Sequence, residues 1–372
     1  MAPLEGLRVI ELARILAGPW AGQVLADLGA DVIKVESPQG DDTRKWGPPF
    51  IENADGSRDA AYFHAANRGK TSRIIDFTTA EGQAEVRRLV RDADVVIENF
   101  KVGGLAKYGL DFSTLSKENP RLIYCSITGF GQNGPRAPQA GYDFIVQGMS
   151  GIMDLTGDPE GAPQKIGVAY ADIMTGLYAV IGIQAALAER ERSGLGQQID
   201  MALLDVMVGT LANQAMNFQV SGISPRRLGN AHPNIAPYEA YPTADDWFIL
   251  AVGNDRQFQR FCEIVGMEPG PDFATNADRI ARRKDLSAMI GKATRRWSRD
   301  DLLSRLEREG VPAGPINTVE EAFAEPQIVA RQMCLKMKDE DGMEIPGVRL
   351  PILFSRSTLG TPRPSPRLPR KS

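Results

Sequence analysis

The sequence predicts an α/β fold, with a large, doubly wound, Rossmann-like domain and a smaller α+β domain. Strand patterns alternate with helical patterns through the first third of the chain, which is typical of a mostly parallel sheet covered by helices on both faces. The length of 372 residues exceeds what one hydrophobic core usually serves. The composition also changes after Ser221, where a proline-containing stretch follows two long apolar segments.

The first third of the chain supplies most of the predicted sheet. Residues 7–12 (LRVIEL) form a strand pattern, followed by a Gly-Pro turn and a helix through residue 28. Residues 81–92 predict an amphipathic helix, because Val86, Leu89 and Val90 share one face. The other expected strands of this region are residues 31–36, 73–76, 95–98 and 121–127.

Two long apolar helices are expected in the middle of the chain. Residues 173–190 are apolar almost all round, which predicts a buried helix. The SGLGQ segment at 193–197 ends this helix, and residues 198–200 predict a short strand. Residues 201–220 predict a second apolar helix.

The predicted domains are residues 1–220, completed by about 325–360, and residues 221–324 with their linkers. Prolines at 225–242 indicate an inter-domain loop, and residues 247–251 (WFILA) begin the smaller α+β region. Its expected helices lie near 255–265 and 300–309. Residues 361–372 are rich in proline and arginine, which predicts a disordered tail.

Composition excludes several classes of function. The net charge of −4 disfavours a nucleic-acid partner. Three widely spaced cysteines and two histidines disfavour a disulfide framework and a metal site. The start, MAPLEGLRVIELA, has no basic and apolar leader pattern, and no apolar run is long enough to predict a membrane span. We therefore expect a cytoplasmic protein with no membrane partner.

A dinucleotide site is the first alternative that the strand–turn–helix start raises. A strand ending in Glu36 lies where a ribose-binding carboxylate would be expected. The turn, LAGPWAG at 16–22, is not GxGxxG, because Pro19 occupies it and the second glycine is missing. An NAD(P)-dependent oxidoreductase is thus disfavoured, although the architecture suits another adenine nucleotide such as coenzyme A.

Motifs along almost the whole chain resemble the class III coenzyme A (CoA) transferases, the family of formyl-CoA transferase, carnitine-CoA transferase and methylacyl-CoA racemase. The resemblance covers VIENFKVGGLAKYGLD at 96–111, SITGFGQNGP at 126–135, AGYDFIVQGMSGIMDLTG at 140–157 and IGVAYADIMTGLYAVIGIQAALAERERSGLGQQIDMALLD at 166–205. It implies the two-domain fold and a homodimer of interlocked, ring-shaped chains. Acyl-CoA and a carboxylic acid would be the substrates, with no permanently bound cofactor.

The resemblance identifies Asp172 in AYADIMTG as the nucleophile. A carboxylate suits covalent transfer of CoA between acids, and a helix start favours the ionised form. From local sequence alone, an aspartate here is more typical of a helix cap. The nearest acidic rivals, Asp200 and Asp205, are interpreted as structural.

Three further residues are expected to line the active site. Tyr142 and Asp143 match positions of this kind in the family, although a Tyr-Asp pair in a loop is also typical of a turn. Family racemases have a histidine where this chain has Tyr142, and racemisation needs groups that remove and return a proton. His232 lies in GNAHPNIAPYEAY, which aligns with a glycine-rich lid but lacks the glycine run; a structural histidine is equally compatible.

The expected CoA contacts follow from the same resemblance. Asn99, Phe100 and Lys101 follow a strand, at the edge where α/β folds bind ligands, and Lys107 matches a usually basic position. Leu16 and Ala17 match residues near the thiol end, although formyl-CoA transferase has glutamine in place of Leu16. Two additional cations that could contact phosphate are Lys34 and Arg44.

The sequence therefore predicts an acyl-CoA:carboxylate CoA-transferase that works through a covalent aspartyl intermediate. The central motif most resembles the branch that uses dicarboxylates, which favours a donor such as succinyl-CoA. A 2-methylacyl-CoA racemase of the same family is one alternative. An NAD(P)-dependent oxidoreductase and a non-catalytic acyl-CoA binding protein are alternatives from other classes.

Overall fold

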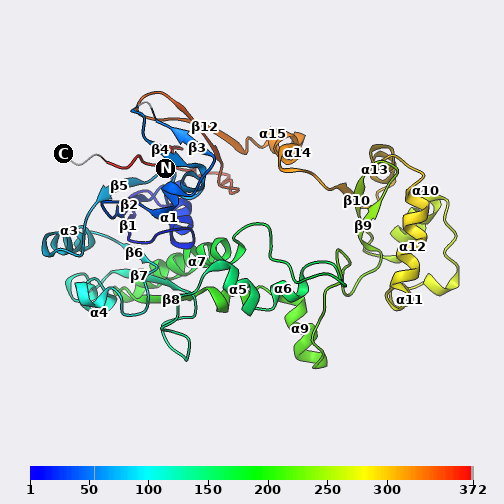
Figure 1. Ribbon diagram of the computed structural model, residues 1–372, viewed down its shortest axis with the longest axis horizontal. Coiled ribbons are helices and arrows are strands. Elements are labelled where there is room, and N and C mark those ends of the chain that lie inside the picture. Colours follow the sequence, from blue (N-terminus) through cyan, green and yellow to red (C-terminus); the bar gives the residue numbers. More distant parts are fainter. Residues whose placement is uncertain (54, 370–372) are drawn as a thin grey trace. The chain divides into compact units, whose positions relative to one another are not determined.

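The computed structural model describes residues 1–53 and 55–369, which divide into two compact units (Figure 1). The larger unit contains Met1–Ile152, Lys165–Gly222 and the chain from Val329 onward. The smaller unit contains Met153–Gln164 and Ile223–Ile328. The chain thus leaves the larger unit twice and returns to it twice.

The larger unit is built on a six-stranded parallel sheet in the order β5-β2-β1-β6-β7-β8. From β1 the chain first adds strands on one side, and then returns to add β6, β7 and β8 on the other. The order reverses between β1 and β6, where such sheets bind ligands at the carboxyl ends of their strands. The strands are β1 Arg8–Glu11, β2 Asp31–Glu36, β5 Thr71–Ile74, β6 Val95–Glu98, β7 Ile123–Thr128 and β8 Gln198–Ala202.

Helices cover both faces of this sheet, because its strands carry apolar residues on both sides. Val9 packs into one core and its neighbour Ile10 into another, as the alternation of side chains along a strand requires. The first core includes residues of α1 Ala17–Asp27, α5 Asp143–Met149, α7 Tyr170–Ser193 and α8 Leu203–Gly209. The second includes residues of α3 Ala80–Arg91 and α4 Phe112–Glu118. The predicted parallel α/β architecture is confirmed.

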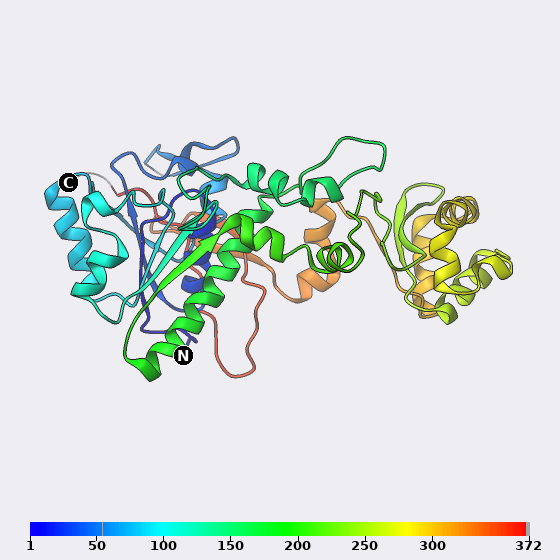
Figure 2. The same cartoon turned by 90° about the horizontal axis from the view of Figure 1, so that it is seen from below.

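Helix α7 contacts α1 and lies against β7 and β8 (Figure 2). It is long and apolar enough to cross a bilayer, contrary to our expectation for the chain, but its Ala179 and Ile183 belong to the core of the larger unit. The prediction that it is buried all round is wrong. Tyr178 and Ile181 expose 43% and 60% of their surfaces, so one apolar side has no partner within the described chain.

The prediction of a second long helix at 201–220 is wrong in its details. Met201 and Ala202 belong to β8, where they pair with β7. The remainder forms α8 and α9 Ala212–Ser221, separated at Thr210. Ala212 has a φ of 48°, outside the right-handed helical region, which breaks the helix.

Short elements complete the larger unit. They are η1 Asp42–Lys45, β3 Phe50–Glu52, β4 Arg58–Ala60, α2 Ala61–His64, η2 Ala106–Tyr108, β12 Cys334–Lys338 and β13 Glu344–Val348. β3 pairs with β4 and β12 pairs with β13, both antiparallel.

Residues 361–369 do not form the predicted disordered tail. Arg363 donates to the carbonyl of Gly69 at 2.6 Å, and the Gly69 amide donates to the Arg363 carbonyl at 2.9 Å. Arg44 donates to the Pro366 carbonyl, and Arg367 forms ion pairs with two aspartates of the β12–β13 region. These contacts with distant residues order the segment, although its composition suggested a solvated, disordered tail. The last three predicted tail residues, 370–372, lie outside the described residues.

The smaller unit has a three-stranded antiparallel sheet in the order β11-β10-β9 and its own core, which includes Phe248, Phe261 and Leu302. The predicted loop at 225–242 ends in a strand, because Tyr238–Pro242 pairs with β10. Arg227 binds Asp154 at 3.0 Å, so 153–164 belong here and not to the first domain as predicted. Its strands and helices are β9 Tyr238–Pro242, β10 Trp247–Ala251, β11 Ala313–Pro315, α10 Asp255–Val265, η3 Pro271–Phe273, α11 Asn276–Ala281, α12 Arg283–Thr294, α13 Arg299–Arg308 and α14 Val319–Ala324. Two helices, α6 Ile152–Leu155 and α15 Pro326–Ala330, lie at the boundaries between the units.

Candidate functional site

Asp172 lies in the first turn of α7 but does not cap it. The N-cap position is Ala169, which has no side chain able to accept a hydrogen bond. The capping oxygen comes from another helix: Asp143 Oδ1 accepts from the amides of Ala171 at 2.8 Å and Asp172 at 3.3 Å. The local interpretation of Asp172 as a cap is therefore wrong, because Asp143 performs that role and leaves the Asp172 carboxylate available.

Asp143 is itself held by a buried glutamine that the sequence analysis missed. Gln147 Nε2 donates to Asp143 Oδ2 at 2.7 Å, and Gln147 Oε1 accepts from the amide of Ile166 at 2.9 Å. Gln147 is fully buried. The i, i+4 spacing of Asp143 and Gln147 was the available sequence signal, since such pairs meet on a helix face.

Burial and a like charge act together on the Asp172 carboxyl group. Burial first, and then the neighbouring Asp143 carboxylate, raises the pKa of Asp172 to about 7. We expected the start of the helix to keep this group ionised, but desolvation outweighs the helix dipole here. The carboxyl group therefore exchanges its proton near neutrality.

Two tyrosines lie in different settings near this carboxylate pair. Tyr142 is the N-cap residue of α5 and exposes 66% of its surface. Tyr62, which the sequence analysis missed, is half-buried in α2. Its pKa is raised by burial and then by the charges of Asp172 and Asp143. No local pattern in the sequence marks Tyr62.

The start of α1 lies against α7, one turn from Asp172. Gly176 follows Asp172 by four residues and so lies on the same helix face. A side chain at Gly176 would meet the carbonyl oxygen of Ala17 at 2.7 Å, which shows how closely the two helices approach. Leu16 and Ala17 are both buried. Ala17 therefore lies against α7, one helical turn from the predicted nucleophile.

Asn99 and Phe100 lie where the strand order reverses. The Asn99 side chain accepts from the Arg14 amide at 2.9 Å and donates to the Arg14 carbonyl at 2.7 Å, so it joins the loops that follow β1 and β6. The Arg14 guanidinium lies 5.2 Å from the centre of the Phe100 ring. Phe100 also packs edge-on against Phe77, and all three of Arg14, Phe77 and Phe100 line an open pocket.

The two predicted lysines lie at or next to a second pocket, beside the carboxyl ends of β6 and β7. Lys101 lines this pocket with Glu98 and Ser126. Burial raises the pKa of Glu98 to about 7, against hydrogen bonds from Ser126 and the Phe100 amide. Lys107 is exposed, and its ammonium lies 4.7 Å from the centre of the Tyr108 ring. Both lysine charges are accessible to an anionic ligand.

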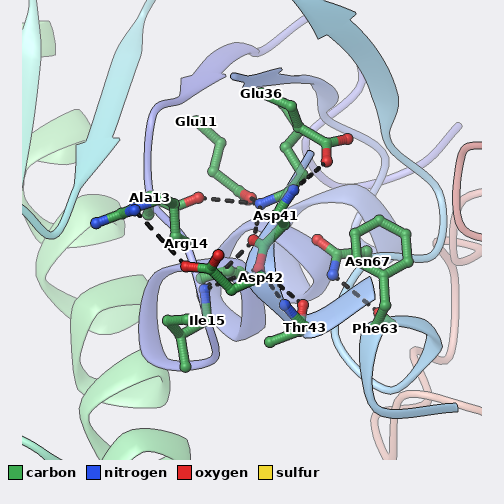
Figure 3. A network of polar contacts seen from close by, with 12 residues as sticks. Glu11, Ala13, Arg14, Ile15, Glu36, Asp41, Asp42, Thr43, Phe63 and Asn67 are labelled. Carbon is green, nitrogen blue, oxygen red and sulfur yellow. Dashed lines mark hydrogen bonds and ion pairs between the residues drawn. The ribbon is translucent and has the colours of Figure 1, made fainter. Parts of the chain in front are cut away.

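Lys34 and Arg44 are not the accessible cations that we expected. Lys34 is completely buried and pairs with Glu11 at 3.0 Å and Asp41 at 2.9 Å. Arg44 pairs with Glu36 at 2.7 Å. Figure 3 shows Glu11, Glu36 and Asp41 converging in this network. Since buried charges must be paired, both cations are engaged by carboxylates within the fold and are not free for a phosphate.

His232 belongs to the smaller unit and is held locally. Its Nδ1 accepts from the Asn234 amide at 3.1 Å, and its ring lies 5.3 Å from that of Tyr238. Its predicted place in the active site stays a prediction. Within residues 1–53 and 55–369, no group of three or more histidine, cysteine, aspartate or glutamate side chains is arranged to hold a metal ion.

The chain is similar to known proteins over almost its entire length. The family model for CoA-transferase family III matches residues 4–371. The succinate–glutarate CoA-transferase of Agrobacterium fabrum is 62% identical over 98% of this chain and 93% of its own. The succinyl-CoA:glutarate CoA-transferase of Homo sapiens is 37% identical over 98% of this chain and 83% of its own. A crystal structure of a CaiB/BaiF family protein from Brucella suis is 60% identical, with a TM-score of 0.90 over 99% of this chain and 96% of that one. The resemblance predicted from the motifs is confirmed, and the chain belongs to CoA-transferase family III and is a CoA-transferase.

Proposed function

We propose that this CoA-transferase moves CoA from succinyl-CoA, or a similar dicarboxylyl-CoA, to a dicarboxylic acid such as glutarate. The Agrobacterium fabrum and Homo sapiens relatives carry names that specify this pair of acids. The expectation from the central motif points to the same class of acyl group. Tyr142, where family racemases have a histidine, disfavours the racemase alternative.

We propose that Asp172 is the nucleophile. Its ionised carboxylate attacks the thioester carbonyl carbon, the C–S bond breaks, and CoA leaves as a thiolate. The thiolate then attacks the Asp172 carbonyl of the mixed anhydride, which releases the donor acid and leaves an aspartyl-CoA thioester. The acceptor carboxylate repeats these steps in reverse and departs as the new acyl-CoA. Each step exchanges one acyl bond for another, without an external proton or oxidant.

The observation that supports this proposal is the half-buried, partly protonated carboxyl group at the start of α7. A carboxylate with a raised pKa is less stabilised by water and is a stronger nucleophile than an exposed one. Asp143, held by Gln147, keeps a second negative charge beside it. The same arrangement would lower the cost of protonating Asp172 when no substrate is present.

We further propose that CoA binds along the carboxyl ends of β1 and β6. Phe100 with Arg14 offers an aromatic and cationic surface for the adenine end, and Lys101 and Lys107 offer charges for phosphate. Leu16 and Ala17, next to α7, would face the thiol end. Asn99 acts in this proposal by shaping the loop, since its side chain is bonded to Arg14.

The proposed active form is a homodimer of interlocked chains. Apolar side chains on one side of α5 and α7 are exposed in the single chain, among them Phe144 at 58% and Ile181 at 60%. A second copy of the chain would bury them. The cytoplasmic location and the lack of a permanent cofactor stay predictions.

The proposal is tested by a paired screen of acyl-CoA donors and acids, with CoA exchange followed by mass spectrometry in deuterium oxide. Succinyl-CoA with glutarate should give glutaryl-CoA without incorporation of deuterium next to the thioester. Deuterium incorporation without transfer would instead identify a racemase. No transfer from any dicarboxylyl-CoA would overturn the proposed substrate class.

Asp172→Ala should fold but lose transfer activity by at least about a thousandfold, as expected when a covalent nucleophile is removed. Hydroxylamine should label Asp172 in the wild-type protein only when acyl-CoA is present. Asp205→Ala is the matched control, because Asp205 is an exposed aspartate on the neighbouring helix α8. Near-normal turnover by Asp172→Ala would show that the nucleophile is another residue.

Lys107→Ala should raise KM for the acyl-CoA about three- to tenfold and leave kcat nearly unchanged, because a phosphate contact contributes equally to the ground and transition states. Lys117→Ala, which alters another exposed lysine, on α4, is the control. Steady-state kinetics with both variants separates a specific phosphate contact from a general effect of surface charge. Equal KM values in the two variants would remove Lys107 from the CoA site.

A further inference from the structure

The loop between β1 and α1 contains a strained residue at its centre. Ile15 has a φ of 71°, in the left-handed region that a β-branched side chain rarely adopts. Such a conformation costs about 1–3 kcal/mol and persists only where the surrounding structure imposes it. The 13–16 turn therefore needs specific contacts to keep its shape.

Asp41 supplies those contacts from a different segment of the chain. Its two carboxylate oxygens accept from the Ile15 amide at 3.4 and 3.3 Å, and the pair faces one another in Figure 3. Lys34 binds the same carboxylate at 2.9 Å and also donates to the carbonyl of Ala13 at 3.0 Å. Asp41 thus holds the turn at the Ile15 amide, and Lys34 holds it at the Ala13 carbonyl.

The Asp41 carboxylate is itself fixed. Thr43 donates to Asp41 Oδ1 from its amide at 3.0 Å and from its hydroxyl at 2.8 Å. The Asp41 amide donates to Glu36 Oε2 at 2.8 Å. The Asp41 side chain is fully buried, so these bonds do not compete with water.

The turn leads directly to the acyl-transfer site. Leu16 and Ala17 follow Ile15, and the Ala17 carbonyl lies against Gly176, one helical turn from Asp172. A shift at Ile15 would therefore move the start of α1 relative to the nucleophile. Displacements of about 1 Å at such a site can lower the rate a hundredfold, because the reacting atoms must be aligned.

We propose that Asp41, supported by Lys34, is a positioning residue that imposes the left-handed conformation of Ile15 and so places Leu16 and Ala17 beside Asp172. In this proposal Asp41 acts through the turn, by its bonds to the Ile15 amide. Only the expected effect of Asp41 on kcat rests on the proposed function. Its structural consequence, protection of the Ile15 amide, is independent of which acids the enzyme uses.

The test compares Asp41→Ala and Asp41→Asn with Asp42→Ala. Asparagine keeps the volume and one acceptor oxygen, so Asp41→Asn remains informative where Asp41→Ala fails to fold. Asp42 is the adjacent aspartate, but it is exposed and only pairs with Arg14 at 3.8 Å on the surface. Asp42→Ala should change kcat by less than about twofold.

Both Asp41 variants should exchange the Ile15 amide faster than wild type, as measured by hydrogen–deuterium exchange on a peptide covering residues 13–17. With the donor and acceptor found in the screen, Asp41→Ala should lower kcat about ten- to a hundredfold with a smaller change in KM, and Asp41→Asn less. Unchanged exchange at this peptide in both variants would overturn the proposal whatever the activity.

Ile15→Gly provides the decisive second change, because glycine adopts a positive φ without strain. When Ile15→Gly is added to Asp41→Ala or to Asp41→Asn, kcat should rise at least about threefold above that of the single Asp41 variant. A loss that is independent of residue 15 would show that Asp41 acts only by stabilising the fold. Wild-type protein with protected Ile15 but no transfer of any acyl group would overturn the proposed function and leave the positioning of the turn supported.

Discussion

A single half-buried carboxyl group, that of Asp172, combines the proposed reactivity with a cost to the stability of the fold. Its pKa is raised to about 7 by burial and by Asp143, whereas an aspartate in an unfolded chain titrates near 4. Above pH 7 the folded protein holds an ionised group that the unfolded chain would hold more favourably. The site therefore destabilises the fold in the pH range where its carboxylate is reactive.

Asp172→Asn should consequently stabilise the protein at pH 8. The gain should be at least about 1 kcal/mol, shrink as the pH falls through 7, and vanish below about pH 4, where the acid is protonated in both folded and unfolded states. Thermal unfolding of both proteins from pH 4 to pH 8 measures this difference. A gain that did not depend on pH would show that the folded-state pKa of Asp172 is not raised.

The charge of Asp143 can be tested separately from its role as a cap. Asp143→Asn keeps an oxygen to accept from the amides of Ala171 and Asp172 but removes the like charge. The acidic limb of kcat/KM, set by ionisation of Asp172, should move to lower pH by less than about one unit, because burial is the larger cause of the shift. An unchanged limb would indicate that Asp143 has no electrostatic influence on the nucleophile.

At the scale of elements, the joint between α5 and α7 determines where the proposed nucleophile, Asp172, lies. Asp143 begins α5 and caps α7, while Gln147 on α5 holds the segment that enters α7 through the Ile166 amide. Two side chains on one helix thus orient the start of another. The short helix α5 thus carries both side chains that orient the start of α7.

Gln147→Leu should lower kcat about tenfold with little change in KM for the acyl-CoA, because the side chain keeps its apolar volume but releases Asp143 and the 166–169 segment. Gln147→Glu tests the donor specifically, since a carboxylate cannot donate to Asp143. Ser150→Ala, which alters another buried polar residue beside α5, serves as the control. Normal kinetics for Gln147→Leu would show that Asp143 is held without it.

The sequence predicted elements best where local pattern and sheet pairing agree. The strands Asp31–Glu36 and Val95–Glu98 have the predicted bounds, because short β-branched runs end at clear turn or charge signals. The helix expected at 201–220 failed because pairing of Met201 with β7 is a long-range contact. Lys34 failed as a surface cation for the same reason, since its partners lie on other segments.

The candidate site could be predicted only in part. The resemblance of AYADIMTG identified Asp172, and Asp143 came from the same comparison of motifs. Tyr62 and Asp41 are brought to the site by the fold of distant segments, and no spacing along the chain reveals them. The raised pKa of Asp172 depends on burial, which a local helix-start argument does not contain.

At the scale of the whole molecule, an apolar side of α5 and α7 is exposed in the single chain. Phe144, Ile145, Tyr178 and Ile181 each expose at least 43% of their surfaces. Soluble proteins rarely leave such a contiguous set of large apolar side chains uncovered. The proposed homodimer accounts for this surface.

Ile181→Glu should weaken the dimer and lower activity at low protein concentration, because it places a charge in an apolar interface. Sedimentation velocity over a range of concentrations measures the shift toward monomer. Lys117→Glu changes an exposed residue on α4, which covers the opposite face of the sheet, and should not shift the equilibrium. A variant Ile181→Glu that stays dimeric would place the interface elsewhere.

The contacts of residues 361–369 have a consequence for synthesis on the ribosome. Gly69 and Arg44 emerge early, whereas their partners Arg363 and Pro366 are translated only after the smaller unit. The larger unit therefore waits, with its early loop unpaired, while the whole smaller unit is translated and able to fold. The larger unit begins first on the ribosome but is completed after the smaller one. In a chain stopped after residue 360, the smaller unit should therefore resist protease, and the larger unit should be sensitive to it.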